Sequence, residues 1–156
     1  SNKILGMMRS RYKRELYADK VDLIRKKIPG CCIGVDVITG FPGETEADFL
    51  DTVDFLNSLE ISYLHVFSYS ERADTYALNI KPVVPLNIRH QRTKILRSFS
   101  YKKMQQFSQK HSGQTRKVLF EGKNKTGIME GFSDNYIKIS TPYREEWTNQ
   151  IIDWKI

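Results

Sequence analysis

A β-branched run that ends in a glycine-rich turn constrains the fold of this chain more than any other stretch. Residues 33–38 read Ile-Gly-Val-Asp-Val-Ile, a pattern typical of a strand covered on both faces of a parallel sheet. The sequence Gly-Phe-Pro-Gly at 40–43 permits a tight turn. Thr45 followed by Asp48 is typical of a helix start. Because ligands bind at the carboxyl ends of such strands, we predict that this turn forms one wall of a binding site.

Apolar periodicity predicts further elements on both sides of the turn. We expect a second strand over 61–69, a long functional loop over 70–84, and helices over 13–28, 45–59 and 85–111. Strand, helix and strand in succession indicate a βαβ unit with two parallel strands. Two strands are too few to bury both faces of a sheet or to close a barrel. We therefore expect a fragment of a larger fold, or a sheet completed by a second copy through its open edge.

The character of the sequence changes at Ser112-Gly113. The following segments are short, β-prone and separated by turn residues: 117–121, 127–131, 135–140 and 149–154. They predict a small antiparallel sheet or barrel. We therefore expect two domains, 1–112 and 113–156, and leave open whether the last strand of the second is complete.

Charge and composition indicate which binding partners and which cellular compartment to expect. The net charge of +7 favours a polyanionic partner such as nucleic acid, although a basic protein without such a partner remains an equal alternative. The basic residues of the helix over 85–111 leave the same choice between RNA contact and simple solvation. No apolar run is long enough to span a bilayer, and no signal-peptide pattern is present. We expect a cytoplasmic protein without membrane association, whose neighbouring Cys31 and Cys32 are small buried strand residues and not metal ligands.

Several motifs, in a recognisable order, carry a resemblance to a known family. They are Met8–Tyr12, Ile33–Thr45 with Asp48 and Phe49, His65–Arg72, and in the tail Leu119–Glu121 and Gly131–Ile137. Together they resemble the methylthiotransferases of the radical S-adenosylmethionine superfamily. The resemblance is strongest to the branch that methylthiolates threonylcarbamoyladenosine beside the tRNA anticodon.

The resemblance implies both a fold and a chemistry. The fold is α/β, a partial (β/α) radical S-adenosylmethionine barrel followed by a small antiparallel β domain of the RNA-binding TRAM type. The cofactors are S-adenosylmethionine and two [4Fe–4S] clusters, which cysteine thiolates hold. In full-length relatives those cysteines lie upstream of the region that corresponds to Ser1. We therefore expect this chain to need the missing N-terminal half of the polypeptide, and to be inactive alone.

The same resemblance implies site residues in the first domain. It assigns cofactor contacts to Asp36, Gly40, Gly43, Glu44, Phe67, Tyr69 and Arg72. Asp36 would accept a hydrogen bond from a ribose hydroxyl or an ammonium group. The alternatives are a purely conformational role for the glycines, a first-turn helix carboxylate for Glu44, and core packing for Phe67 and Tyr69. We assign no catalytic residue and no metal ligand within the chain.

RNA contacts are expected from both domains. The residues are Arg9, Arg11, Lys123, Lys125, Phe132, Tyr136 and Lys138. Small β domains hold single-stranded RNA by stacking bases on aromatic rings and by neutralising phosphates. The alternative is that Phe132 and Tyr136 only fill the small core.

Other functions are compatible with these residues. The chain could be a free-standing RNA-binding module, or the methylthiotransferase could act on isopentenyladenosine in tRNA or on a ribosomal-protein aspartate. Salt-sensitive tRNA binding by residues 115–156 alone would favour the binding module.

Overall fold

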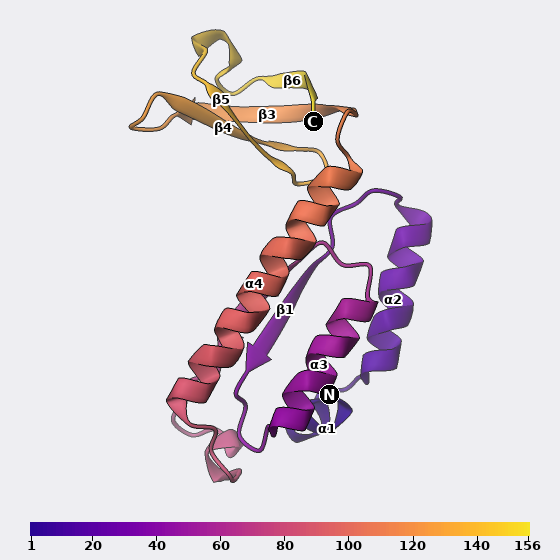
Figure 1. Cartoon of the computed structure of the whole chain (residues 1–156), viewed down its shortest axis with the longest axis vertical. Coiled ribbons are helices and arrows are strands. Elements are labelled where there is room, and N and C mark those ends of the chain that lie inside the picture. Colours follow the sequence, from indigo (N-terminus) through magenta and orange to yellow (C-terminus); the bar gives the residue numbers. More distant parts are fainter. The chain divides into compact units, whose positions relative to one another are not determined.

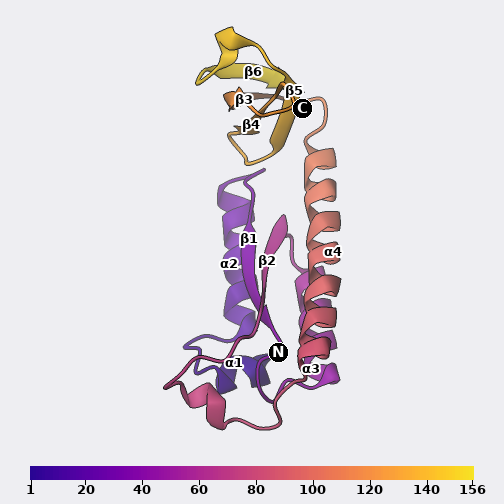
Figure 2. The ribbon, with the colours of Figure 1, turned by 90° about the vertical axis from the view of Figure 1, so that its left-hand side faces the viewer.

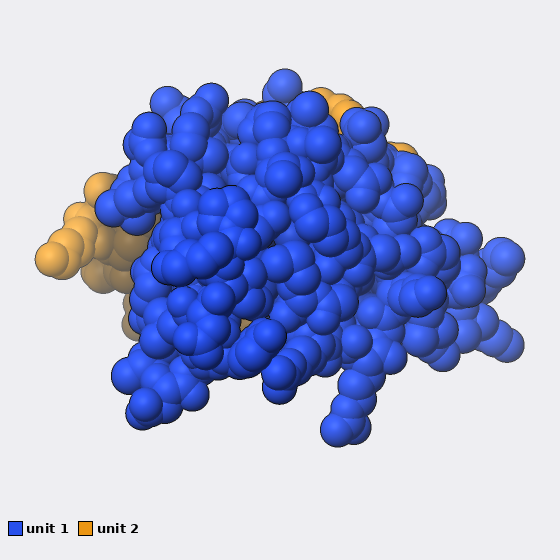
Figure 3. Space-filling view, turned by 90° about the horizontal axis from the view of Figure 1, so that it is seen from below, with its two compact units in different colours: residues 1–29, 33–104 blue, residues 30–32, 105–156 orange.

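The computed structural model describes all 156 residues and divides them into two compact units. Unit 1 consists of Ser1–Pro29 and Ile33–Met104, and unit 2 consists of Gly30–Cys32 and Gln105–Ile156 (Figure 3). No helix combines the length and the apolar character that crossing a bilayer requires.

Unit 1 is an α/β arrangement around two strands. Its elements are α1 (Asn2–Met7), α2 (Arg14–Lys27), β1 (Gly34–Thr39), α3 (Glu46–Ser58), β2 (Tyr63–Ser68), a 3₁₀ turn η1 (Tyr76–Asn79) and most of α4 (Leu86–Lys110) (Figure 1). The strands are parallel, with Gly34 opposite Tyr63 and Thr39 opposite Ser68 (Figure 2). The predicted pair of parallel strands joined by a helix is therefore confirmed.

Only one face of this two-stranded sheet is covered. Val35 and Leu64 point into a core that also contains Phe49 of α3 and Leu96 of α4. On the opposite face, Ile38 is 41% exposed and Phe67 is 53% exposed. The expectation of a strand covered on both faces is therefore wrong for β1, because the helices of this chain pack on one side of the pair.

The glycine turn and the start of α3 follow from local sequence. Gly40 and Gly43 adopt positive φ angles of +75° and +83°, which glycine tolerates without steric cost. Thr45 caps α3: its hydroxyl accepts from Asp48 N, and the Asp48 carboxylate accepts from Thr45 N at 2.9 Å. The predicted helix start is confirmed as a capping box.

One helix near the N-terminus was not predicted, and one local prediction before β1 is wrong. Residues 2–7, which show no clear apolar period, form α1 and bury Ile4. Cys31 and Cys32 lie in the loop before β1 and are half-buried, not in the strand. The strand begins later because Gly30, with a φ of +79°, still belongs to the turn that follows α2.

Unit 2 is built on a four-stranded antiparallel sheet. Its strands are β3 (Thr115–Lys123), β4 (Ile128–Ser133), β5 (Lys138–Pro142) and β6 (Ile151–Lys155), in the order β5-β4-β3-β6, with a 3₁₀ turn η2 (Glu145–Trp147). Val118, Phe120 and Met129 are fully buried, and Trp147 and Trp154 pack against them. The predicted small antiparallel sheet is confirmed.

Candidate functional site

The turn after β1 is organised by one buried carboxylate. Glu44 Oε2 accepts from Gly40 N at 2.8 Å and from Arg92 Nη1 at 2.7 Å. The side chains of Glu44 and Arg92 are only 4% and 6% exposed. Arg92 also donates to Glu46 at 2.9 Å. Removing either buried partner would leave the other charge desolvated, so the pair fixes the shape of the turn.

The two glycines of the turn are packed against protein side chains. A Cβ atom at Gly40 would collide with the side chain of Arg89, and one at Gly43 would collide with Met7. Both positions therefore require glycine for conformation and for close packing. Neither glycine lines either of the two cavities described below.

Arg89 ties the loop over 70–84 to the start of α4. Its guanidinium donates to Glu71 Oε1 at 2.6 Å and to the carbonyls of Tyr69 and Val84 at 3.1 and 2.8 Å. The hydrogen bond from Arg89 holds the pKa of Glu71 below its usual range. The two ends of the loop are thus held by a single side chain.

Two cavities lie beside the exposed face of β1 and β2. The first, of about 340 Å³, is lined by Asp36, Glu44 and Phe67 together with residues of α1 and α2. The second, of about 320 Å³, is lined by Phe67, Tyr69 and Arg72 at the carboxyl ends of the strands. Ile38, Phe67 and Met8 line both cavities. The structure therefore brings together all the residues of the expected cofactor set except the two glycines.

Two hydroxyl groups in this region are buried without a hydrogen-bond partner. They are Ser68 Oγ and Tyr69 Oη, and both residues line the second cavity. Phe41 contacts Tyr69 edge to ring face at a centroid distance of 5.4 Å. A buried hydroxyl is costly to leave unpaired, so this wall offers hydrogen bonds to a ligand among apolar and aromatic groups. The sequence singled out Tyr69, but nothing in it marked Ser68.

The expected RNA-binding arginines have different surroundings. The Arg9 guanidinium lies 4.2 Å from the centroid of the Tyr76 ring, and Arg9 itself has a φ of +58°. Arg11 is exposed between α1 and α2. Arg9 is therefore held by an aromatic ring of the 70–84 loop, whereas Arg11 has no such contact.

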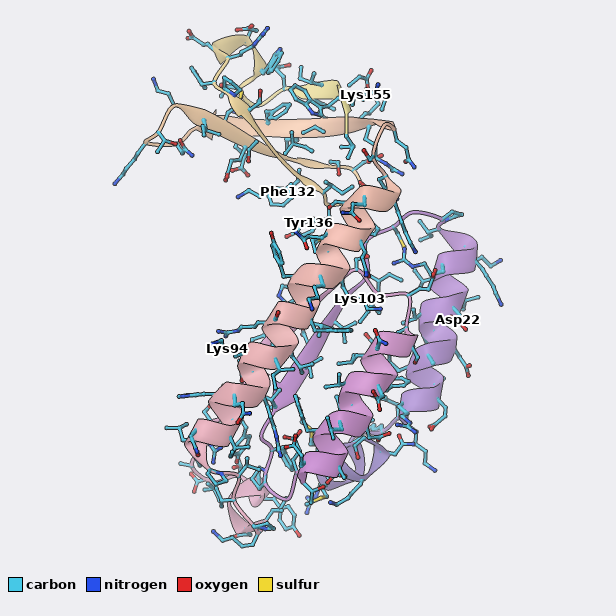
Figure 4. The ribbon with its side chains drawn as sticks, in the orientation of Figure 1. Asp22, Lys94, Lys103, Phe132, Tyr136 and Lys155 are labelled. Atoms are coloured by element: carbon cyan, nitrogen blue, oxygen red, sulfur yellow. The ribbon has the colours of Figure 1, made fainter.

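The outer face of the unit 2 sheet carries a cross-strand apolar row. Leu119 pairs with Phe132 on one side and with Ile151 on the other. Tyr136 stacks on Phe132, with ring centroids 4.9 Å apart, and is 52% exposed (Figure 4). Neither ring belongs to the buried core of the unit. Leu119 and Ile151 were not among the predicted site residues, although alternation along β3 with buried Val118 would have placed Leu119 outward.

The expected lysines of unit 2 lie around this sheet. Lys138, opposite Phe132 in the register, forms an ion pair with Glu130 at 2.7 Å. Lys123 Nζ lies 5.2 Å from the centroid of the Tyr143 ring, and Lys125 is exposed in the turn after β3. Positive charge therefore accompanies the exposed rings, though Lys138 is partly neutralised.

The chain contains no group of three or more histidine, cysteine, aspartate or glutamate side chains placed to hold a metal ion. The residues present therefore do not fit an iron–sulfur cluster, whose ligands are cysteine thiolates.

The fold and site together define an α/β unit with ligand-sized cavities at its strand ends, followed by an antiparallel β unit with exposed aromatic rings. No protein-family model matches the chain. Individual proteins do match. The chain is 40% identical over 139 residues to the threonylcarbamoyladenosine tRNA methylthiotransferase MtaB of Aquifex aeolicus, which covers 89% of this chain and 33% of that protein.

Two further relatives extend the similarity. The enzyme of the same name from Bacillus subtilis is 31% identical over 160 residues, covering 100% of this chain and 36% of its own length. The tRNA-2-methylthio-N(6)-dimethylallyladenosine synthase of Syntrophomonas wolfei is 38% identical over 126 residues, which cover 81% of this chain and 28% of that protein. The chain belongs to the MiaB-like methylthiotransferase family, and it spans about a third of the length of these relatives.

Proposed function

We propose that this chain is part of a radical S-adenosylmethionine enzyme that methylthiolates a modified adenosine in tRNA. Unit 1 would contribute one wall of the cofactor site as part of a (β/α) barrel, and unit 2 would serve as a TRAM-type RNA-binding domain. Similarity along the chain to methylthiotransferases of two named specificities supports the enzyme class. The paired cavities at the exposed sheet face support the placement of the ligand.

The residues around the second cavity fit a nucleoside-containing ligand. Ile38 and Phe67 provide apolar surface for a base, and the hydroxyls of Ser68 and Tyr69 provide hydrogen bonds. Asp36 lies exposed on β1 beside the first cavity, where its carboxylate would accept from a ribose hydroxyl or an ammonium. The resemblance implies that S-adenosylmethionine supplies radical and methyl-transfer chemistry when bound.

Glu44 would act differently from the other members of this set. Its Oε2 atom already accepts from Gly40 N and Arg92. We therefore assign Glu44 the role of positioning the turn, with Arg92 as its partner. Gly40 and Gly43 would hold the same turn in its shape and would not contact the ligand.

RNA binding would fall to the stacked rings of unit 2. Tyr136, stacked on the half-buried Phe132, presents an aromatic surface to solvent, which suits stacking by an unpaired base. Lys123, Lys125 and Lys138 would neutralise phosphates near it. Threonylcarbamoyladenosine is the favoured target because two relatives carry that specificity in their names. Dimethylallyladenosine, named in the third relative, is the second candidate.

A chimera tests the enzyme class and its substrate. The matching third of the Bacillus subtilis relative is replaced by this chain in a strain that lacks its own gene, and tRNA nucleosides are analysed by mass spectrometry. We expect the methylthio group to return on threonylcarbamoyladenosine. A soluble, cluster-loaded chimera that restores no methylthiolated nucleoside would contradict the proposal, and its return on dimethylallyladenosine would reassign the substrate.

Variants of the same chimera test the cofactor wall. Asp36→Asn replaces a charged hydrogen-bond acceptor by a neutral one, and Ser68→Ala removes a hydrogen bond. Each should weaken S-adenosylmethionine binding about tenfold, which corresponds to roughly 1.4 kcal/mol. Asp19→Asn, an exposed carboxylate on α2, is the matched control and should bind the cofactor normally. Normal cofactor affinity in both wall variants would place the ligand elsewhere.

A further inference from the structure

One face of α4 is free of acidic side chains along its whole length. The helix runs for 25 residues and contains no aspartate or glutamate. Its exposed positions include three basic residues and several uncharged hydrogen-bonding residues: Lys94, Arg97, Lys102, Gln91, Ser98 and Tyr101. We call these six residues the basic face of α4. At 3.6 residues per turn they fall on one side of the helix.

The basic residues on the opposite side of α4 already have structural tasks. Arg89 donates to Glu71, and Arg92 donates to Glu44. Lys103 donates to the carbonyls of Asn57 and Leu59 at the end of α3. Lys94 projects from the side of the helix opposite to Lys103 (Figure 4). The inward basic residues are thus explained by the fold.

The exposed cations have no such explanation. Lys94, Arg97 and Lys102 form no ion pair or side-chain hydrogen bond with the rest of the chain. Tyr101, in the same face, is 66% exposed. Such side chains contribute little to the stability of the fold. They are therefore free to contact an external partner.

The helices α2 and α3, unlike α4, contain acidic residues. The segment α3 contains Glu46, Asp48, Asp51 and Asp54 and no basic residue. The segment α2 mixes both signs, with three acidic and five basic residues in RELYADKVDLIRKK. Ordinary solvated faces intersperse opposite charges, as α2 does. The basic face of α4 therefore has the charge pattern of a surface that meets an anion.

The uncharged residues of the basic face indicate which class of anion would bind there. Contacts to nucleic-acid phosphates and sugars come from arginine and lysine, and also from serine, glutamine and tyrosine. Those five residue types make up the whole basic face. From Lys94 to Lys102 the face is about 12 Å long, enough to follow a short run of phosphates along one strand.

We propose that the basic face of α4 binds the sugar-phosphate backbone of RNA, as a second contact surface besides the rings of unit 2. The proposal rests on the proposed function, because it takes tRNA as the RNA. Such contacts position an RNA without reading its sequence. The basic face therefore raises the affinity for RNA and fixes its position along the protein. Other residues select the target base.

The test is a salt titration of tRNA binding by the 156-residue chain. The variant is Lys94→Gln/Arg97→Gln/Lys102→Gln, and the probe is unfractionated bacterial tRNA. Loss of three phosphate contacts should lower the slope of log affinity against log salt by about 2. The same change weakens binding roughly 100-fold near 0.1 M salt. Circular dichroism should show unchanged helix content, since all three side chains are exposed.

The matched control removes equal charge from α2. Lys20→Gln/Lys26→Gln/Lys27→Gln removes the same number of exposed positive charges without touching α4. We expect less than a threefold loss of affinity and a nearly unchanged salt slope. Equal weakening by both triple variants would show a general effect of net charge and would overturn the proposal.

The outcomes separate this proposal from the proposed function. If the unaltered chain binds tRNA, and Phe132→Ala/Tyr136→Ala weakens binding while the α4 variant does not, the proposed function stands and the α4 surface fails. If the unaltered chain shows no salt-dependent tRNA binding at all, the RNA-binding role proposed for this chain fails along with it.

Discussion

The two units hold their shapes by different interactions. Unit 1 buries Glu44, Arg89 and Arg92 around the turn after β1 and pairs each of these charges with an opposite one. Unit 2 centres on Phe120 and Met129 and keeps its ion pairs at the surface. The contrast teaches that the proposed cofactor wall depends on paired buried charges. Loss of one partner leaves the other charge buried and unpaired, which destabilises the unit. The sheet of unit 2, which we propose to bind RNA, depends on packing, which tolerates changes of charge.

The tryptophans make this contrast measurable. The chain has two, Trp147 and Trp154, and both pack on the core of unit 2. Tryptophan fluorescence therefore reports the packing of unit 2, whereas far-ultraviolet circular dichroism is dominated by the helices of unit 1. These two signals therefore separate a loss of stability in unit 1 from one in unit 2.

The largest effect is expected from Arg92→Met. The substitution leaves the Glu44 carboxylate buried without its cation and should lower the free energy of unfolding by roughly 3–5 kcal/mol. Denaturant unfolding followed by circular dichroism measures the loss. We expect the tryptophan signal to change far less.

A double variant sharpens that result. Glu44→Met in addition to Arg92→Met removes both buried charges and should recover part of the loss. If the double variant is less stable than Arg92→Met by the full cost of a second substitution, the two side chains are not coupled. The charge-based account of the turn would then be abandoned.

The next effect is expected from Met129→Ala in unit 2. This residue is fully buried, so its truncation should cost roughly 2–4 kcal/mol by leaving a cavity. The loss should appear in tryptophan fluorescence and should not depend on salt. A cost that fell with added salt would show that charge also supports this core.

A smaller, pH-dependent effect is expected from Asp48→Asn at the start of α3. Burial opposes ionisation of Asp48, but hydrogen bonds from Lys3 and Thr45 outweigh it and hold the pKa well below its usual range. The depressed pKa stabilises the fold at neutral pH. The contribution is lost as the pH falls below the usual aspartate pKa, near 4. We expect a loss of about 1 kcal/mol at pH 7 that shrinks toward zero in acid, measured by thermal unfolding across pH.

The smallest effect is expected from Lys117→Gln. Its ion pair with Asp153, at 3.4 Å, is exposed on the unit 2 sheet. Exposed pairs contribute little, so the stability should change by less than about 0.5 kcal/mol. A loss of stability above about 1 kcal/mol would show that the surface ion pairs of unit 2 do stabilise its fold.

Local sequence predicted the parts of the fold that depend on neighbours in the chain. Thr45 and Asp48 are three residues apart, and together they form the whole capping box. Gly40 and Gly43 supply the positive φ angles of the turn that their spacing suggested. The alternating and β-branched runs likewise located β1, β2 and the four strands of unit 2.

Contacts between distant residues could not be predicted in this way. Glu44 and Arg92 are 48 positions apart, and no periodic pattern links them. The contact between Gly40 and Arg89 could not be predicted for the same reason, although a side chain at Gly40 would collide with Arg89. Exposure of Ile38 and Phe67 depends on what packs on the second face of the sheet, which propensity does not report.

The backbone at Tyr136 has a consequence for recognition. Its φ of +67° is one that glycine or asparagine adopts more easily than a tyrosine. Glycine there would relax the loop and would delete the ring that rests on Phe132. The loop thus accepts conformational strain to hold an aromatic ring in a fixed orientation. Under the proposed function, less motion of this ring would be lost when a nucleobase stacks on it.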